Sequence, residues 1–352
     1  MKPWLSALTL ATFSLSVFAQ DKKPTPAAPP PAKPAAATAP ATPPATKPAP
    51  APAAKPATPA PTEPKKPTPP PPAAPKPAAV DPKKPATPSL AAKPAPAPKA
   101  VSIFPDKALE EAVRKQVFAK RDNKEPITAE DVANLAVIEG RGLGIKDLTG
   151  LEKCPQLASI TLPKNKISNL TPLKGLERLQ FVDLAENEVQ DVTALGTLKS
   201  LQFVDLSSNK VSNIAPLGSA LTLNSLYLAN NQITDVSSLS KLSKLWTLHL
   251  DGNKVAKLDG IGQLKWLSML SLDKNEVVDL TPLEPLTDLQ FLILTGNKVA
   301  DLTPLQRMMK KDFDGAKEWA PFCDVRLTGN PLNDASKKIV EELTKLGARI
   351  TP

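Results

Sequence analysis

Asparagine returns every 22 residues between positions 165 and 297 of this chain, and no other feature limits its possible folds as strongly. Each of these asparagines follows a leucine by three residues and precedes a β-branched residue by two. A second aliphatic residue stands two positions ahead of each leucine. The asparagines are Asn165, Asn187, Asn209, Asn231, Asn253, Asn275 and Asn297. A fixed period of this length, kept without a gap, predicts a stack of equivalent structural units.

The pattern within one unit is Leu-x-x-Leu-x-Leu-x-x-Asn, which is the leucine-rich repeat. Apolar residues two apart lie on the same side of a short strand, so both face the core. One repeat cannot bury its apolar side alone, and neighbouring repeats therefore stack with their strands parallel. The amide of each asparagine is expected to satisfy backbone groups where the chain leaves the strand. We predict an α/β fold, a leucine-rich repeat solenoid with a curved parallel β-sheet on the concave face and short 3-10 or helical turns on the convex face.

The convex turns are marked by proline and aspartate. Thr-Pro-Leu occurs at residues 171, 281 and 303, and Ala-Pro-Leu at residue 215. Proline is favoured in the first helical positions, where its missing N–H is not needed. Four aspartates stand just before such turns, where they are predicted to cap them. They are Asp191, Asp235, Asp279 and Asp301.

Both ends of an open stack of repeats need caps. Residues 101–134 are predicted to form a helical N-terminal cap, with one helix that begins after Asp106 and a second short helix that begins at Thr128. Residues 135–305 hold the repeats. The C-terminal end is therefore expected to have its own capping segment.

Residues 306–352 are predicted to form a C-terminal capping repeat and helix. The next asparagine of the ladder, Asn330, follows Asn297 by 33 residues, which is one repeat plus an insertion. The insertion, over residues 306–319, has a helical pattern. A last helix is predicted from Asp334 through residue 345, ended by a glycine at residue 347.

The first 100 residues differ from the rest in composition. Residues 1–19 start with Lys2 and continue with an apolar run that ends at Ala19, which indicates an export signal cleaved after Ala19, with an uncleaved anchor as the alternative. Residues 20–100 hold 29 of the 42 prolines and no aromatic residue. They cannot bury enough apolar surface to fold, and we predict a disordered Pro/Ala/Lys-rich linker.

The positive charge of the chain lies in this linker. Residues 20–100 carry twelve lysines and three acidic residues, a net charge of +9, whereas residues 101–352 carry 31 basic and 32 acidic residues, a net charge of −1. A basic segment can make weak contact with an anionic cell wall or membrane. The repeats show no basic footprint, so no nucleic-acid partner is expected.

Two motifs ahead of the repeats carry a family resemblance. They are Ile103-Phe104-Pro105-Asp106 and Ile127-Thr128-x-Glu130-Asp131. With the 22-residue repeats, they make residues 101–305 resemble the internalin family of bacterial surface proteins. The resemblance implies a secreted or surface module that binds another protein through its concave face. Internalins commonly continue into an immunoglobulin-like domain and a C-terminal wall anchor; neither is visible here, and the Pro-rich segment comes first.

Residues that flank the strand leucines point to the concave side. Exposed aromatic residues gathered on one face mark interaction sites, and aspartates on neighbouring strands would select a partner with basic groups. The alternative is an ordinary solvated sheet with aromatic cross-strand pairs. The predicted partner-binding residues are Phe181, Asp183, Phe203, Asp205, Tyr227, Trp246, His249, Asp251, Met269, Asp273, Phe291 and Ile293.

Other side chains are expected to have structural roles. Aspartates on rigid neighbouring strands and one histidine supply few ligands, so we expect no metal and no cofactor. Cys154 and Cys323 lie about eight repeats apart, or ~40 Å at ~4.8 Å per strand, too far for a disulfide. Trp266 and Trp319 are expected to be packing residues.

Three functions follow from this sequence. The first is an exported protein–protein interaction module, a monomer in the periplasm, on the cell surface or in the medium. The second is a structural envelope protein attached through its basic Pro-rich segment, with no specific concave-face ligand. The third is an enzyme, which is disfavoured because no nucleophile elbow, phosphate loop or metal-ligand spacing is found. We predict the first, with a protein partner of unknown identity.

Overall fold

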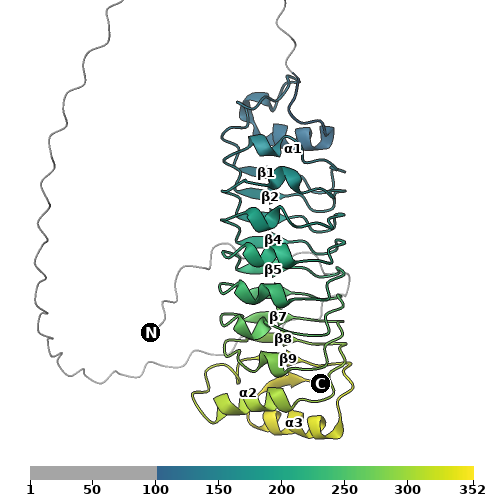
Figure 1. The fold of residues 1–352 in the computed structure, drawn as a ribbon, viewed down its shortest axis with the longest axis vertical. Coiled ribbons are helices and arrows are strands. Elements are labelled where there is room, and N and C mark those ends of the chain that lie inside the picture. The colour runs from purple at the N-terminus through teal and green to yellow at the C-terminus, as the bar shows by residue number, and fades with distance from the viewer. Residues whose placement is uncertain (1–100) are drawn as a thin grey trace, which may run out of the picture. The chain divides into compact units, whose positions relative to one another are not determined.

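The computed structural model describes residues 101–352 (Figure 1). The predicted signal and linker, residues 1–19 and 20–100, lie outside the described residues. Within residues 101–352, ten strands of three residues form one sheet, in which each strand pairs in parallel with the next one along the chain. They are β1 Val137–Glu139, β2 Ser159–Thr161, β3 Phe181–Asp183, β4 Phe203–Asp205, β5 Ser225–Tyr227, β6 Thr247–His249, β7 Met269–Ser271, β8 Phe291–Ile293, β9 Asp324–Arg326 and β10 Arg349–Thr351.

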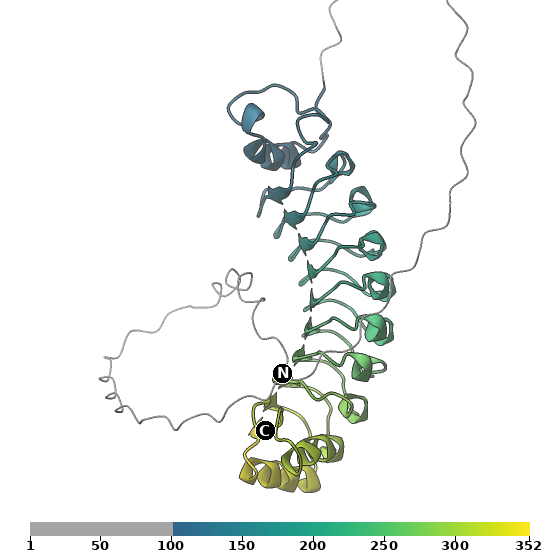
Figure 2. The ribbon, with the colours of Figure 1, turned by 90° about the vertical axis from the view of Figure 1, so that its left-hand side faces the viewer.

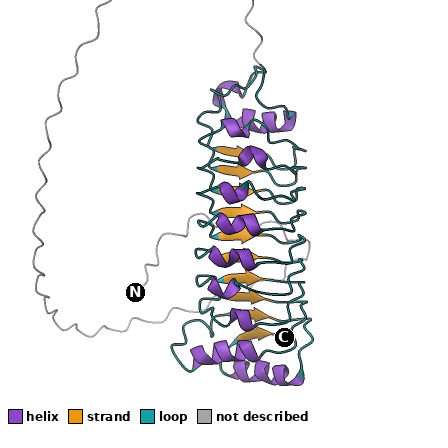
Figure 3. Ribbon diagram, viewed as in Figure 1, coloured by secondary structure: helices purple, strands orange, loops and turns teal. Residues whose placement is uncertain are grey.

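A short 3-10 turn returns the chain on the opposite side in most repeats (Figure 3). Seen from the side, the strands of residues 101–352 follow the inner edge of a shallow arc and the turns follow its outer edge (Figure 2). The turns are η2 Leu151–Lys153, η3 Thr171–Leu173, η4 Leu195–Thr197, η5 Ala215–Ser219, η6 Ser237–Lys241, η7 Ile261–Gln263 and η8 Thr281–Leu283. The predicted solenoid, with a parallel sheet on its concave face, is confirmed.

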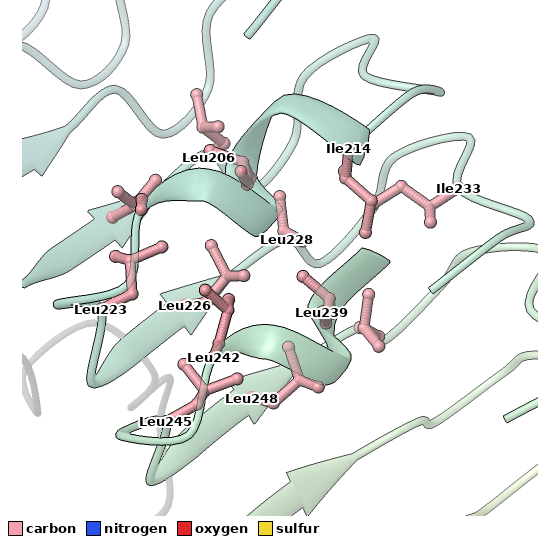
Figure 4. Packing of buried hydrophobic residues seen from close by; sticks show 14 of the residues in the cluster. Leu206, Ile214, Leu223, Leu226, Leu228, Ile233, Leu239, Leu242, Leu245 and Leu248 are labelled. Carbon is pink, nitrogen blue, oxygen red and sulfur yellow. The ribbon is translucent and has the colours of Figure 1, made fainter. Parts of the chain in front are cut away.

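The core is built from the repeated aliphatic positions. In the repeat around β5 and β6, Leu226, Leu228, Leu239, Leu242 and Leu245 are fully buried (Figure 4). Equivalent residues of the other repeats belong to the same continuous cluster. Each buried leucine contributes about 1.5–3 kcal/mol, so the stack is held mainly by contacts between neighbouring repeats.

The predicted capping role of the aspartates ahead of the convex turns is wrong, because the N-cap positions are taken by Ala194, Val236, Leu280 and Leu302, none of which has a side-chain cap bond. The aspartates instead close a local turn just ahead of these positions. Asp191 and Asp235 each accept the backbone N–H two residues later at 2.8 Å. Asp279 does the same at 2.8 Å and Asp301 at 2.9 Å. Each bond satisfies an N–H that the short turn leaves without a backbone partner.

At the N-terminal end, α1 (Lys107–Gln116) buries Leu109 and Val113 against the first repeat. One oxygen of Asp106 caps this helix, and the other accepts the backbone N–H groups of Lys146 and Asp147 at 2.8 and 3.0 Å. Burial acts to raise the pKa of Asp106, but these backbone hydrogen bonds together lower it below its usual value. One carboxylate thus ties the cap to the repeats.

The predicted second helix of this cap is wrong. Residues 129–134 form turns, and the cap contains instead a 3-10 turn, η1 Phe118–Lys120. The carboxylate of Asp131 accepts both the backbone N–H of Thr128, at 2.8 Å, and its hydroxyl, at 3.1 Å. These bonds close a local turn, which competes with a helix.

The insertion is helical over a shorter and earlier range than predicted. Helix α2 spans Thr303–Phe313, because the Thr-Pro-Leu turn at residue 303 continues as a helix. The helix ends at Phe313, and the carboxylate of Asp312 accepts the N–H groups of Glu318, Trp319 and Ala320 in the loop that follows, at 3.1, 3.3 and 3.0 Å. The predicted range of 306–319 therefore included a loop.

Helix α3 (Asp334–Lys345) agrees with the prediction and is followed by Gly347 at a φ of 105°. The side chain of Asn333 caps it by accepting the N–H of Ser336 at 2.8 Å. The chain then forms β10, which was not predicted and which pairs with β9. None of the helices in residues 101–352 has the length and apolar character needed to span a bilayer.

Candidate functional site: the concave sheet face

Each central strand presents its first and third residues on the concave face, because its middle residue is buried in the core. The parallel register places equivalent residues of successive strands opposite one another. We call the two resulting columns the first row and the second row. The first row contains Phe181, Phe203, Ser225, Thr247, Met269 and Phe291, and the second contains Asp183, Asp205, Tyr227, His249, Ser271 and Ile293.

Four of the predicted residues form one continuous stack of rings, which we call the aromatic run. Phe181 and Phe203 are stacked with ring centroids 4.2 Å apart and planes 8° apart. Phe203 lies 5.3 Å from Tyr227 in a tilted arrangement, and Tyr227 stacks on His249 at 4.8 Å. The run crosses from the first row to the second because Ser225, opposite Phe203, is too small to continue the stack.

The run continues toward the C-terminal repeats through a contact with the sulfur of Met269. The Nε2 atom of His249 lies 3.1 Å from the sulfur of Met269. Phe291 lies opposite Met269 in the first row and is 36% exposed, and Ile293 is half-buried in the second row. The predicted residues of the five consecutive strands β3 to β7 thus form an unbroken aromatic and apolar path.

Two carboxylates flank the N-terminal half of this path. Asp183 and Asp205 are opposite one another in β3 and β4, and each accepts a backbone N–H two residues later, at 3.1 and 2.8 Å. Burial raises the pKa of Asp183 to about 6, and the charge of Asp205 adds to this shift. Burial also raises the pKa of Asp205. Within residues 101–352, neither carboxylate forms an ion pair with a basic side chain.

The second pair of aspartates has a different arrangement. Asp251 accepts the hydroxyl of Ser271 and, at 3.0 Å, the backbone N–H of Asp273, and its other oxygen lies 3.4 Å from Nδ1 of His249. Burial acts to raise the pKa of Asp251, but hydrogen bonds from His249 and Ser271 lower it on balance. Sequence reasoning placed Asp251 and Asp273 side by side but missed Ser271, which anchors Asp251.

Trp246 lies apart from the aromatic run. It stands just before β6 and is 51% exposed, and no ring of residues 101–352 stacks on it. Trp319 is buried as predicted, but Trp266 is 67% exposed, so its predicted packing role is wrong. Trp266 stands between two buried leucines in the sequence, but its own position faces solvent. Only its large size had suggested burial.

A shallow polar hollow of about 470 Å³ lies where the first strands begin. Its lining includes Arg178, together with Gln180, the residue before Phe181. Within residues 101–352, no group of three or more acidic, histidine or cysteine side chains is arranged to hold a metal ion. The chemistry offered by the concave face is therefore stacking, apolar contact and acceptance of positively charged groups.

Comparison with known proteins agrees with this architecture. The family model described as "Leucine Rich repeats (2 copies)" matches residues 222–263. No curated protein matches the chain. Internalin C2 of Listeria monocytogenes has a solved structure that is 29% identical, with a TM-score of 0.50, over 71% of this chain and 94% of its own.

Two further solved structures have the same fold. The internalin InlF of Listeria monocytogenes is 22% identical, with a TM-score of 0.52, over 71% of this chain and 92% of its own. A leucine-rich repeat protein of Leptospira interrogans is 26% identical, with a TM-score of 0.51, over 57% of this chain and 50% of its own. The chain therefore has a leucine-rich repeat fold that is similar to that of bacterial internalins, in agreement with its cap motifs and repeats.

Proposed function

We propose that this chain is an exported protein-binding module that holds a protein partner on its concave face. The observation that carries the proposal is the aromatic run from Phe181 to His249, which continues without a break through Met269. Rigid strands hold these rings in place before any partner arrives, so little side-chain freedom is lost on binding. Large preorganised aromatic residues are typical of binding hot spots.

The acidic residues give the proposed site its selectivity. Asp183 and Asp205 are half-buried beside the run and lack a basic neighbour at ion-pair distance within residues 101–352. A lysine or arginine from a partner would satisfy both carboxylates, whereas an acidic partner would be repelled. We therefore expect a partner segment that combines apolar or ring contacts with basic groups.

The test is an affinity pull-down from envelope and culture fractions with the full chain. Wild type is compared with a Phe203→Ala, Tyr227→Ala, Phe291→Ala variant and with the matched control Trp266→Ala, which removes an exposed aromatic residue outside both rows. Circular dichroism checks that all three are folded. A protein retained by wild type and by the control, but lost by the triple variant, supports the proposal.

Two other outcomes would contradict it. Equal retention by wild type and the triple variant would place the binding surface outside the aromatic run. Retention that depends only on residues 20–100 would favour the alternative of a structural envelope protein attached through its basic segment, whose net charge is +9.

A further inference from the structure

We propose that the surface where the chain enters its strands binds an extended glycan that carries carboxylate groups. This surface, which we call the strand-entry edge, is formed by the residues one and three positions before each strand, from Asn134 to Ser268. It lies outside both rows of the concave face, so the inference does not rest on the proposed function. Three features of the edge support it: its register, its unpaired polar side chains and its two exposed tryptophans.

The backbone holds the edge in register from repeat to repeat. The N–H of Gln202 donates to the carbonyl of Gln180, that of Asn224 to Gln202 and that of Trp246 to Asn224, each at 2.9 Å. The position between the two outward ones is a fully buried leucine, as in Leu201, Leu223 and Leu245. The outward side chains therefore form two columns with a step of ~4.8 Å per repeat. This step is close to the length of one sugar unit in an extended glycan, so successive repeats can contact successive sugars.

The N-terminal half of the edge is hollow and lined with amides. The hollow of about 470 Å³ lies here, and its small lining residues include Ala136 and Ala158. The amides of Gln180, Gln202 and Asn224 are exposed and form no side-chain hydrogen bond within residues 101–352. An amide offers a donor and an acceptor side by side, which is what the hydroxyl groups of a sugar require. A row of unpaired amides is therefore suited to a polyhydroxylated ligand.

The charged residues of the edge are basic. Arg178 and Lys244 stand three positions before β3 and β6, are exposed, and form no ion pair with any residue of 101–352. The two columns hold no acidic residue from Asn134 to Ser268. Arginine matches the geometry of a carboxylate with two parallel hydrogen bonds. A glycan with carboxylate groups is thus attracted to this edge and repelled by the aspartates of the concave face.

Two tryptophans stand at the C-terminal end of the edge. Trp246 is 51% exposed and Trp266 is 67% exposed, and neither stacks on another ring of residues 101–352. The N–H of Ser268 donates to the carbonyl of Trp246 at 2.9 Å, so Trp266, two residues before Ser268, belongs to the adjoining repeat. The C–H groups of a sugar ring carry a small positive charge and pack on the electron-rich face of an indole. From Arg178 to Trp266 the edge spans four repeats, or about 19 Å, which is enough for several sugars.

The test is isothermal titration of the full chain with a hexamer of uronic acid, at ~0.15 M salt, where charge attraction is screened beyond about 8 Å. The Trp246→Ala, Trp266→Ala variant is expected to bind at least about tenfold more weakly, because both sugar platforms are lost. The Arg178→Gln, Lys244→Gln variant is expected to bind about fivefold more weakly. All variants keep residues 20–100, so attraction by that basic segment is the same in each. Circular dichroism checks folding, and the second variant changes no apolar residue, so it remains informative if the first is unstable.

Two further probes separate the sugar from its charge. A neutral hexamer of glucose is expected to bind wild type about fivefold more weakly than the uronic acid hexamer, since it leaves both basic side chains unpaired. A hexamer of glutamate carries the charge without the sugar rings, so its binding is expected to be the same in wild type and in the tryptophan variant. The matched control is the Phe203→Ala, Tyr227→Ala, Phe291→Ala variant of the concave face, which should bind the uronic acid hexamer as wild type does.

Four results would overturn the proposal. Absence of binding of the uronic acid hexamer, or binding that the tryptophan variant keeps in full, would mean that the edge is not a glycan site. Equal affinity for the neutral and the acidic hexamer would remove the carboxylate from the proposed ligand. Binding of the glutamate hexamer that depends on the tryptophans would assign the edge to an acidic peptide. A protein captured from envelope fractions by wild type and lost by the tryptophan variant, without any hexamer binding, would make the edge a protein-binding surface.

Discussion

The side-chain oxygen of Asn231 accepts the backbone N–H of Val211, in the preceding repeat, at 2.9 Å. Its amide nitrogen donates to three carbonyl oxygens, those of Leu206 at 2.9 Å, Leu228 at 3.0 Å and Ala229 at 3.2 Å. The residue is only 7% exposed. One side chain thus satisfies buried backbone groups of two successive repeats, where no strand can reach them.

Asn231→Ala should therefore destabilise the repeats by about 1–3 kcal/mol for each buried group left without a partner. Urea denaturation followed by circular dichroism measures the loss as a lower midpoint. Gln232→Ala is the matched control, because this neighbouring residue is exposed. Equal midpoints for wild type and Asn231→Ala would show that the asparagine column does not stabilise the stack.

This column was predictable because its cause is local. A residue type repeated at one position of a 22-residue unit must serve the same purpose in each unit, and an amide at the end of a strand can both accept and donate. The equivalent bonds recur from Asn165 to Asn330. The same reasoning located the buried leucines.

Two features of the structure depend on tertiary context and could not be predicted in the same way. The aromatic run crosses from the first row to the second between Phe203 and Tyr227, which depends on how those side chains tilt over Ser225. Strand β10 has no repeat pattern; Arg349–Thr351 pairs with β9 because α3 turns the chain back onto the sheet edge. Neither spacing nor composition contains this information.

A backbone conformation recurs beside the asparagine column and gives a second prediction. Gly296, just before Asn297, has a φ of 67°, and Lys274, at the same position of the preceding repeat, has a φ of 52°. A Cβ on Gly296 would lie 3.5 Å from its nearest neighbouring atom, which is an ordinary contact distance. Gly296→Ala therefore adds backbone strain and little steric clash. We expect a loss of about 1 kcal/mol. Lys274 already has a Cβ in this conformation, so Lys274→Ala should change stability much less. Equal losses of stability in the two variants would contradict this explanation.

The cysteines give a third prediction. Cys154 and Cys323 are unpaired and fully buried, and burial raises the pKa of each thiol to about 12. Only a thiolate reacts with a disulfide reagent, so the native chain should show no reaction at pH 8 over many minutes. The unfolded chain should show two reactive thiols, which is the whole cysteine content of the sequence. Absence of free thiol in the unfolded monomer would be incompatible with the distance between these repeats.

The concave carboxylates give a prediction about pH. Burial raises the pKa of Asp183 from its ordinary value of 3.8 to about 6, with a further contribution from Asp205 and an opposing one from Arg141. Between these two pKa values the folded chain holds a proton that the unfolded chain has lost. The resulting stability is therefore fully present below pH 3.8 and is lost as the pH rises through about 6.

Asp183→Asn cannot ionise, and its side-chain oxygen can still accept the N–H of Ala185. Its stability relative to wild type should therefore increase as the pH rises from 4 toward 7. Solvent screening at a half-buried carboxyl limits the gain to about 1 kcal/mol. Urea midpoints at four pH values from 4 to 7 measure it, with Asp191→Asn as the control, because hydrogen bonds from Thr193 lower the pKa of Asp191 and place its titration below this range. The difference between Asp191→Asn and wild type should stay constant from pH 4 to 7, because the stability linked to a lowered pKa is complete above 3.8 and is lost only at lower pH. A difference between Asp183→Asn and wild type that also stays flat with pH would mean that Asp183 is ionised as readily in the folded chain as in water.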